Sequence, residues 1–150
     1  MKEVKKQVVQ ALNDELEERL KLSTQAYNDA LESRNNDTKS SAGDKYETSR
    51  AMMQQEMDNA EISIHQAKLF KNELSRLPLE ENSEVVISGS LVETNLGIYF
   101  LGLSLGKVVV NNQVVYAVST ASPLGKLLLN GKVGDAINLN NTQQKILRIT

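Results

Sequence analysis

The sequence predicts an α+β protein, in which two long helices precede a small sheet that carries one short helix. Apolar residues recur at three- and four-residue spacing from about Val4 to Leu77, which is typical of amphipathic helices. From about Val85 to Thr150 the apolar residues instead form short runs that are typical of strands. A polar segment, residues 34–44, separates the two helical stretches and indicates a turn.

Each helical stretch carries a seam of apolar residues along one side. The seam of the first helix, with its extension towards the N-terminus, consists of Val4, Val8, Leu12, Leu16, Leu20, Tyr27 and Ala30, and Ser23 interrupts it. The seam of the second helix has heptad spacing at Tyr46, Met53, Ala60, Ala67 and Leu74, with Met57 and Ile64 in between and with Arg50 and Lys71 as its polar breaks. Two such seams can bury each other.

We expect the two helices to pair within one chain as an antiparallel coiled coil, in a monomer. The alternative is an intermolecular coiled coil in which the polar segment continues the helix. Gly43 argues against it, because glycine costs about 1 kcal/mol relative to alanine inside a helix. The neighbours Ser40, Ser41 and Asp44 favour caps and turns. The predicted domains are therefore a helical hairpin over residues 1–78, with its tip at about 34–45, and a sheet domain over 79–150.

The sheet domain begins where the spacing changes, because Pro78 ends the second helix. An apolar run at residues 85–87 opens the domain, and predicted strands then cover residues 90–93, 98–103, 107–110, 113–118, 136–139 and 145–149, with Asn111-Asn112 as a hairpin turn. One short helix over 122–129 has Ser122 as its N-cap and Pro123 at its first position, and Asn130-Gly131 ends it. We expect an antiparallel sheet whose core includes Leu124, Leu127, Leu128, Val115 and Leu147.

Composition excludes several functions. The net charge of −2 comes from acids and bases that are spread along the chain, so no basic surface is available for free DNA or RNA. The chain has no cysteine, which excludes disulfides and thiolate metal sites. No apolar run approaches the roughly 20 residues that span a bilayer, and the first residues do not form an apolar signal core. We expect a cytoplasmic protein without membrane contact.

A helical hairpin precedes a small sheet domain with Ser122-Pro123-Leu124 at a helix start and Gly131-Lys-Val-Gly-Asp135 downstream. In this order, these features resemble the GreA/GreB family of bacterial transcription elongation factors. The resemblance implies an FK506-binding-protein-like sheet domain that docks on RNA polymerase and a hairpin whose tip enters the secondary channel. Ser122 and Pro123 match a family segment that contacts polymerase, although Ala121 stands where GreB-like members have aspartate. Ser122 and Pro123 are equally typical of simple helix capping.

The family's chemistry depends on a pair of tip acids that help to hold a second Mg²⁺ in the polymerase active site, so the accessory factor itself is not an enzyme. The family's acid positions fall on Lys39 and Ala42, which cannot bind a metal through a carboxylate. Asp44 and Glu47 have the same spacing, and Asp37 is a further candidate. Asp44 and Glu47 are also typical of a capping box at a helix start. The predicted tip comprises Lys39, Ser40, Ser41, Gly43, Asp44 and Lys45; it has no intrinsic cofactor and shares Mg²⁺ with the polymerase.

Two other functions stay open at this point. A coiled-coil interaction module with a non-polymerase partner would bind through its apolar flank. A prolyl isomerase would need an aromatic-lined site, for which the sheet domain offers only Tyr99, Phe100 and Tyr116. His65, the only histidine, has no partners for a familiar metal or catalytic site and is expected at the surface. The choice between stimulated cleavage, inhibited synthesis and competition with another channel factor also stays open.

Overall fold

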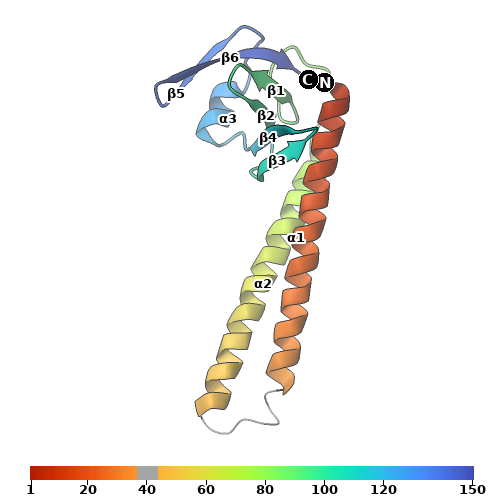
Figure 1. Ribbon diagram of the computed structural model, residues 1–150, viewed down its shortest axis with the longest axis vertical. Helices are drawn as coiled ribbons and strands as arrows, with labels where there is room; N and C mark the ends of the chain where they lie inside the picture. Colours follow the sequence, from red (N-terminus) through yellow and green to blue (C-terminus); the bar gives the residue numbers. More distant parts are fainter. Residues whose placement is uncertain (37–43) are drawn as a thin grey trace. The chain divides into compact units, whose positions relative to one another are not determined.

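The computed structural model describes residues 1–36 and 44–150, together with the side chains of all these except residues 44–46 (Figure 1). It confirms the α+β class. The elements in chain order are α1 (Lys2–Asn36), α2 (Asp44–Arg76), β1 (Leu91–Thr94), β2 (Ile98–Leu101), β3 (Gly106–Val110), β4 (Gln113–Val118), α3 (Pro123–Leu128), β5 (Ala136–Leu139) and β6 (Thr142–Ile149).

The chain divides into two compact units. The sheet unit consists of Met1–Asp14 and Asn72–Thr150, and the helical unit consists of Glu15–Lys71. Residues 1–14, which the sequence placed with the hairpin, group with the sheet in this division. Val8 and Leu12 are fully buried there, so the first turns of α1 contribute core residues to the sheet unit.

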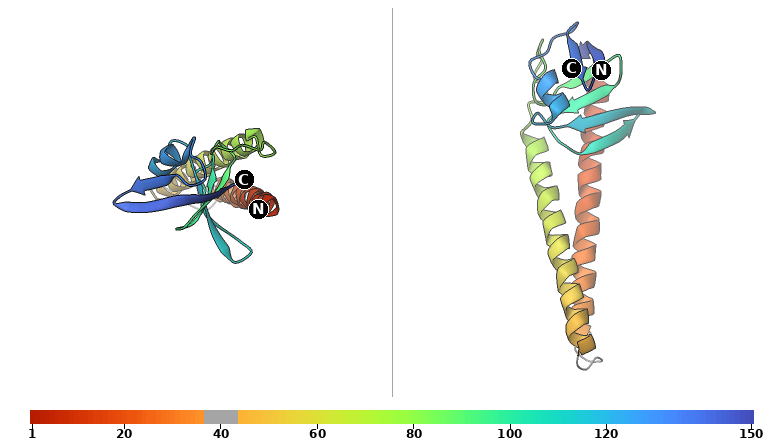
Figure 2. Two further views of the ribbon diagram at one scale, coloured as in Figure 1. Left: turned by 90° about the horizontal axis from the view of Figure 1, so that it is seen from above. Right: turned by 90° about the vertical axis from the view of Figure 1, so that its left-hand side faces the viewer.

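Within the helical unit, α1 and α2 lie side by side and run antiparallel (Figures 1 and 2). An ion pair joins Glu17 to Lys71, and the Arg34 guanidinium donates to Gln54 Oε1 at 2.7 Å. The number of residues from Glu17 to Arg34 along α1 equals the number from Gln54 to Lys71 along α2. Both contacts therefore fit one antiparallel register. Among the described residues of this unit, those that are buried all come from the predicted seams: Leu16, Ala30, Met57, Ala60 and Ala67. The intramolecular hairpin is therefore confirmed.

The sheet has the strand order β3-β4-β2-β1-β6-β5. Four of its pairings are antiparallel as expected, but β2 pairs with β4 in parallel, so the sheet is mixed. The reason is that the chain reverses twice between these strands, at residues 102–105 and at the β3–β4 turn. Glycines in the left-handed region, Gly102 (φ 145°) and Gly106 (φ 80°), flank the first reversal.

Two hairpin turns use the same Asn-Asn dipeptide. Asn111 and Asn112 have φ values of 51° and 62°, which confirms the predicted turn between β3 and β4. Asn140 and Asn141 have nearly the same values, 52° and 63°. This second turn was not predicted from the sequence. Because it ends at Asn141, β6 begins at Thr142 rather than at the predicted residue 145.

The core of the sheet unit confirms part of the predicted set. Leu128 and Val115 are fully buried, and Leu124 packs against the main cluster. Leu127 and Leu147 were wrongly placed in the core, because they are 44% and 48% exposed. A six-residue helix turns only one face to the sheet, which Leu124 and Leu128 occupy at four-residue spacing. Leu147 follows the buried Ile146 on β6, so alternation points it to the opposite face.

No helix within residues 1–36 and 44–150 combines the length and the apolar character needed to cross a membrane.

Candidate functional site

The loop before α3 is held by two serines. Ser122 is the N-cap of α3 and its Oγ accepts a hydrogen bond from the Gly125 amide at 3.0 Å. The same hydroxyl donates to the main-chain oxygen of Ser119 at 2.7 Å. Ser119 Oγ in turn accepts from the amides of Ala121 and Ser122, at 3.1 and 3.2 Å. The predicted capping by Ser122 is therefore confirmed, with Pro123 at the first helical turn.

The same loop also presents an accessible corner. Ala121 and Pro123 are exposed, while Ser122 is half-buried because its hydroxyl is engaged in capping. Lys126 and Leu127, on the solvent side of α3, are exposed as well. A partner could reach Pro123 and the edge of Ser122 without unfolding the cap. The contact of Ser122 and Pro123 with polymerase stays a prediction.

The predicted tip falls largely outside the described residues. This applies to Asp37, Lys39, Ser40, Ser41, Ala42 and Gly43, and to the side chains of Asp44 and Lys45. α2 begins at Asp44, and Glu47 is exposed in its first turn. The pairing of Asp44 with Glu47, whether as a capping box or as metal ligands, is therefore untested.

The remaining candidates for chemistry are His65 in the helical unit and three aromatic residues in the sheet unit. His65 is exposed on α2, as expected, and among the described residues no three acids or histidines lie together as a metal site would require. The rings of Tyr99 and Tyr116 pair on neighbouring strands, with centroids 6.1 Å apart. Phe100 is fully buried and follows Tyr99 on the same strand, so the two side chains point to opposite faces of the sheet. The three aromatic residues therefore do not line one site.

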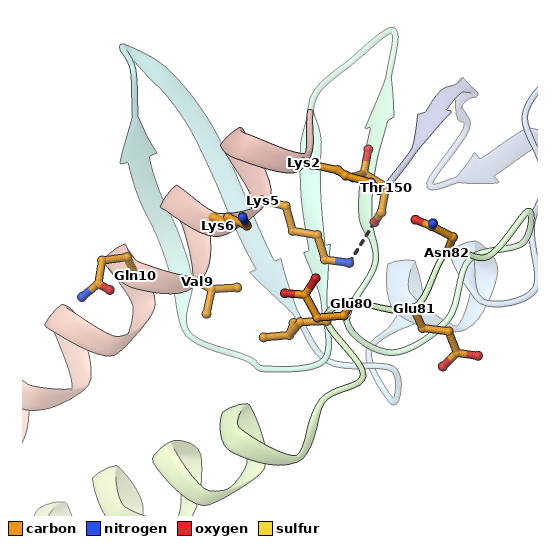
Figure 3. A pocket seen from close by; sticks show the side chains of 10 residues that line it. Lys2, Lys5, Lys6, Val9, Gln10, Glu80, Glu81, Asn82 and Thr150 are labelled. Atoms are coloured by element: carbon orange, nitrogen blue, oxygen red, sulfur yellow. Dashed lines mark hydrogen bonds between the residues drawn. The ribbon is translucent and has the colours of Figure 1, made fainter.

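A cavity of about 420 Å³ lies in the sheet unit, between the first turns of α1 and the segment that follows α2 (Figure 3). Basic side chains come from α1 and acidic ones from the later segment. Its lining consists of Lys2, Lys5, Lys6, Val9, Gln10, Leu79, Glu80, Glu81, Asn82 and Thr150. This volume is within the range of small-molecule sites. Neither Ser122 nor Pro123 lines it.

Lys5 is the innermost charged group of this cavity. It is only 6% exposed, and its Nζ donates to the main-chain oxygen of Thr150 at 3.3 Å (Figure 3). Burial lowers the pKa of Lys5 below its ordinary value, and the nearby Glu80 carboxylate partly opposes that shift. No ion pair joins Lys5 to an acid within the described part of the chain.

Lys5 was not predicted as a buried residue, although its spacing in the sequence indicates burial. Lys5, Val8, Leu12 and Leu16 follow one another at three- and four-residue steps, and all four are buried. A lysine at a core-spaced position of an amphipathic helix is unusual, because lysine is rarely buried without a partner. The spacing could have identified Lys5 as buried, but not the cavity beside it.

No model of a protein family matches this sequence, and no curated protein matches it either. The resemblance to elongation factors therefore rests on the layout and on the short motifs of the chain itself.

Proposed function

We propose that this chain is a bacterial, cytoplasmic accessory factor of the Gre type that binds RNA polymerase. In this proposal the FK506-binding-protein-like sheet domain docks on the polymerase and the tip of the helical hairpin enters the secondary channel. The factor modulates elongation or transcript cleavage there, and any cleavage is carried out by the polymerase active site. Mg²⁺, where it takes part, is held jointly with the polymerase.

The antiparallel pairing of α1 and α2 is the observation that carries the proposal. A hairpin within one chain brings Asn36, the last residue of α1, and Asp44, the first residue of α2, to the same end of the helical pair. The contacts of Glu17 with Lys71 and of Arg34 with Gln54 fix the register over much of the pair. An intermolecular coiled coil would offer no such end.

The loop before α3 supplies the second support. Its cap holds Pro123 at an exposed position, next to the half-buried Ser122. These are the two positions where the chain matches the family segment that contacts polymerase. The exposed Ala121 lacks the carboxylate of GreB-like members, so we expect docking through shape and main-chain groups at this corner rather than through an acid.

The test is a cleavage assay on stalled elongation complexes of the cognate polymerase, with Mg²⁺, combined with a pull-down on the purified polymerase. Asp44→Ala/Glu47→Ala removes the candidate acids. Asp58→Ala/Glu61→Ala is the matched control, because it removes an exposed acid pair of identical spacing further along α2. Cleavage that is lost only in the first double variant would establish a catalytic tip. Binding without cleavage would make the protein a non-cleaving channel factor, and absence of binding would refute the proposal.

Docking is tested separately from capping by two substitutions. Ser122→Thr retains the capping hydroxyl but adds a methyl group at the corner, and Pro123→Ala removes the exposed ring. Each variant should keep the thermal stability of the natural chain to within about 1 kcal/mol while weakening capture by the polymerase. Unchanged capture by both variants would show that this corner is not the contact.

An interaction module with a different partner is the second candidate, and an exposed leucine favours it. Leu22 is 60% exposed, and it lines two adjoining hollows on the helical unit, together with small residues such as Ser23 and Ser63. Leu22→Ser should abolish binding to such a partner and leave polymerase capture intact. The tip variant should have the opposite effects.

A further inference from the structure

β3 is an edge strand of the sheet, and it presents both an apolar and a basic side chain to solvent. Val109 is 60% exposed, and Lys107 on the same strand is exposed as well. We propose that β3 binds an extended peptide segment of a partner protein, which joins the sheet as an antiparallel strand. In this pairing an acidic residue of the peptide lies opposite Lys107 and an apolar residue lies opposite Val109. The surface shares no residue with the corner before α3, so its occupation does not depend on the proposed polymerase contact.

The main-chain groups of β3 alternate in direction. The two-residue turn after β3 has positive φ at both asparagines, and in such a turn the flanking Val110 and Gln113 exchange main-chain hydrogen bonds. Every second residue of β3 does the same, so the amides and carbonyls of Lys107 and Val109 point away from β4. Within the described part of the chain, no main-chain hydrogen bond from another segment reaches these two residues. Water solvates such groups at an exposed edge, and an added strand takes its place.

The β3–β4 hairpin is both accessible and held in place. In both views of Figure 2 its teal strands project outward from the rest of the sheet. Lys107 and Val109 are exposed, and Val108 between them is half-buried. At the turn, the Asn111 side chain donates to Gln7 Oε1 at 2.6 Å, which ties the hairpin to the first turns of α1 within the sheet unit. The edge is therefore a preformed template, and ordering it costs little on binding.

The other edge strand, β5, lacks comparable side chains. Its hairpin has the same kind of two-residue turn, so Ala136 and Asn138 are the residues whose main-chain groups point outward. Both side chains are exposed, but one is small and the other is polar. On β3, by contrast, the exposed Val109 shares a face of the sheet with Tyr116 of β4, which is 44% exposed. An apolar edge of this kind favours pairing with a further strand.

The charge of Lys107 decides between a partner peptide and a second copy of this chain. Lys107 forms no ion pair within the described residues. If two copies paired antiparallel about Lys107, like charges would lie opposite each other, and pairing about Val108 would set Lys107 against Val109. Pairing about Val109 would place Lys107 opposite Asn111 of the turn. A peptide with an acid opposite Lys107 and an apolar residue opposite Val109 avoids these mismatches, because both kinds of cross-strand pair stabilise a sheet.

The test uses the full ¹⁵N-labelled chain and a synthetic pentapeptide, acetyl-Thr-Val-Thr-Glu-Thr-amide. When it pairs antiparallel with β3, its valine lies opposite Val109 and its glutamate opposite Lys107. We expect saturable shifts of the Lys107 and Val109 amide resonances, with a dissociation constant of about a millimolar. N-methylation of the peptide's valine should abolish binding, because that amide donates to β3. N-methylation of the central threonine, whose amide points away from β3, should change the dissociation constant by no more than about twofold.

Three outcomes would overturn the proposal. One is the absence of any saturable shift, and another is an equal loss of binding for the two methylated peptides. The third is a shift of the Lys107 and Val109 amides that depends on protein concentration without peptide, because the edge would then pair with a second copy.

Charge reversal tests the register of the pairing. Lys107→Glu should weaken binding of the pentapeptide at least about threefold, and it should strengthen binding of an analogue with lysine in place of glutamate. Lys145→Glu is the matched control and should change neither affinity, because Lys145 is exposed on β6, next to the opposite edge of the sheet. Equal effects of the two variants would refute the pairing of the acid with Lys107. The methylated peptides bind the natural chain, so their result does not depend on the folding of either variant.

Discussion

Replacing Gly125 by alanine should destabilise the sheet unit through a direct collision. The added Cβ would lie 1.9 Å from the main-chain oxygen of Ser119 and 2.9 Å from Ser122 Oγ, where ordinary contacts begin at 3.4 Å. The main-chain oxygen cannot rotate away as a flexible side chain can. α3 would therefore have to move by more than an ångström, and this movement would break the hydrogen bonds of Ser122 to Gly125 and to Ser119.

The expected loss follows from three contributions. Overpacking of this kind costs roughly 1–3 kcal/mol. Loss of the N-cap costs about 1 kcal/mol. Alanine regains about 1 kcal/mol as a better helix former than glycine. The free energy of unfolding should thus fall by about 2 kcal/mol, which corresponds to roughly 4–8 °C in melting temperature for a chain of this size.

Thermal unfolding followed by circular dichroism measures this loss. Lys126→Ala is the matched control, because Lys126 is the next residue of the same helix and is exposed. It should change the free energy of unfolding by about 0.5 kcal/mol or less. If Gly125→Ala melted at the same temperature as Lys126→Ala, the close approach of α3 to Ser119 would be refuted.

Three further predictions concern the hairpin, a turn and the buried lysine. Met57→Ala should lower the free energy of unfolding by about 2–5 kcal/mol, since Met57 is 4% exposed in the seam. Urea titration measures this loss. In the same assay Met52→Ala, at a residue that is 57% exposed, should change the free energy of unfolding by about 0.5 kcal/mol or less. Equal losses for the two variants would show that Met57 is not buried between the helices. Asn141→Val should lower the free energy of unfolding by about 1–2 kcal/mol, because valine tolerates a φ of 63° poorly. An unchanged melting temperature would refute the positive φ at this position of the turn. Burial lowers the pKa of Lys5 below 10.5 in the folded chain, and Glu80 partly opposes this shift. At pH values between the lowered pKa and 10.5, the unfolded chain therefore binds more protons than the folded chain. The stability of the natural chain relative to Lys5→Met should therefore rise with pH over this range. If the difference between their urea midpoints did not change with pH, the lowered pKa of Lys5 would be refuted.

Local rules account for most of what the sequence predicted correctly. The heptad spacing of α2 located the buried Met57, Ala60 and Ala67 because burial on a paired helix depends on periodicity alone. The start of α3 followed from Ser122 and Pro123, since capping involves only neighbouring residues. The Asn111-Asn112 turn followed from the tolerance of asparagine for positive φ. The overlooked turn at Asn140 obeys the same rule.

Features that depend on pairing between distant segments could not be predicted from such local rules. Nothing within residues 98–101 or 113–118 indicates that these strands pair in parallel, because the direction of each strand depends on how many times the chain reverses between them. Leu127 and Leu147 have the same apolar character as their buried neighbours. Only the side of the sheet against which α3 packs decides which leucines are buried.

The surroundings of Lys5 could not be predicted from the sequence, although the sequence predicts much of the fold correctly. The periodic stripe places Lys5 in line with Val8 and Leu12, which is enough to bury it but says nothing about its partners. Those partners, Thr150 and Glu80, lie far away in the sequence and come together with Lys5 only because the first turns of α1 belong to the sheet unit. A lysine amine that contacts an oxygen of Thr150 near the Glu80 carboxylate is thus held by partners that only the folded sheet unit brings to it.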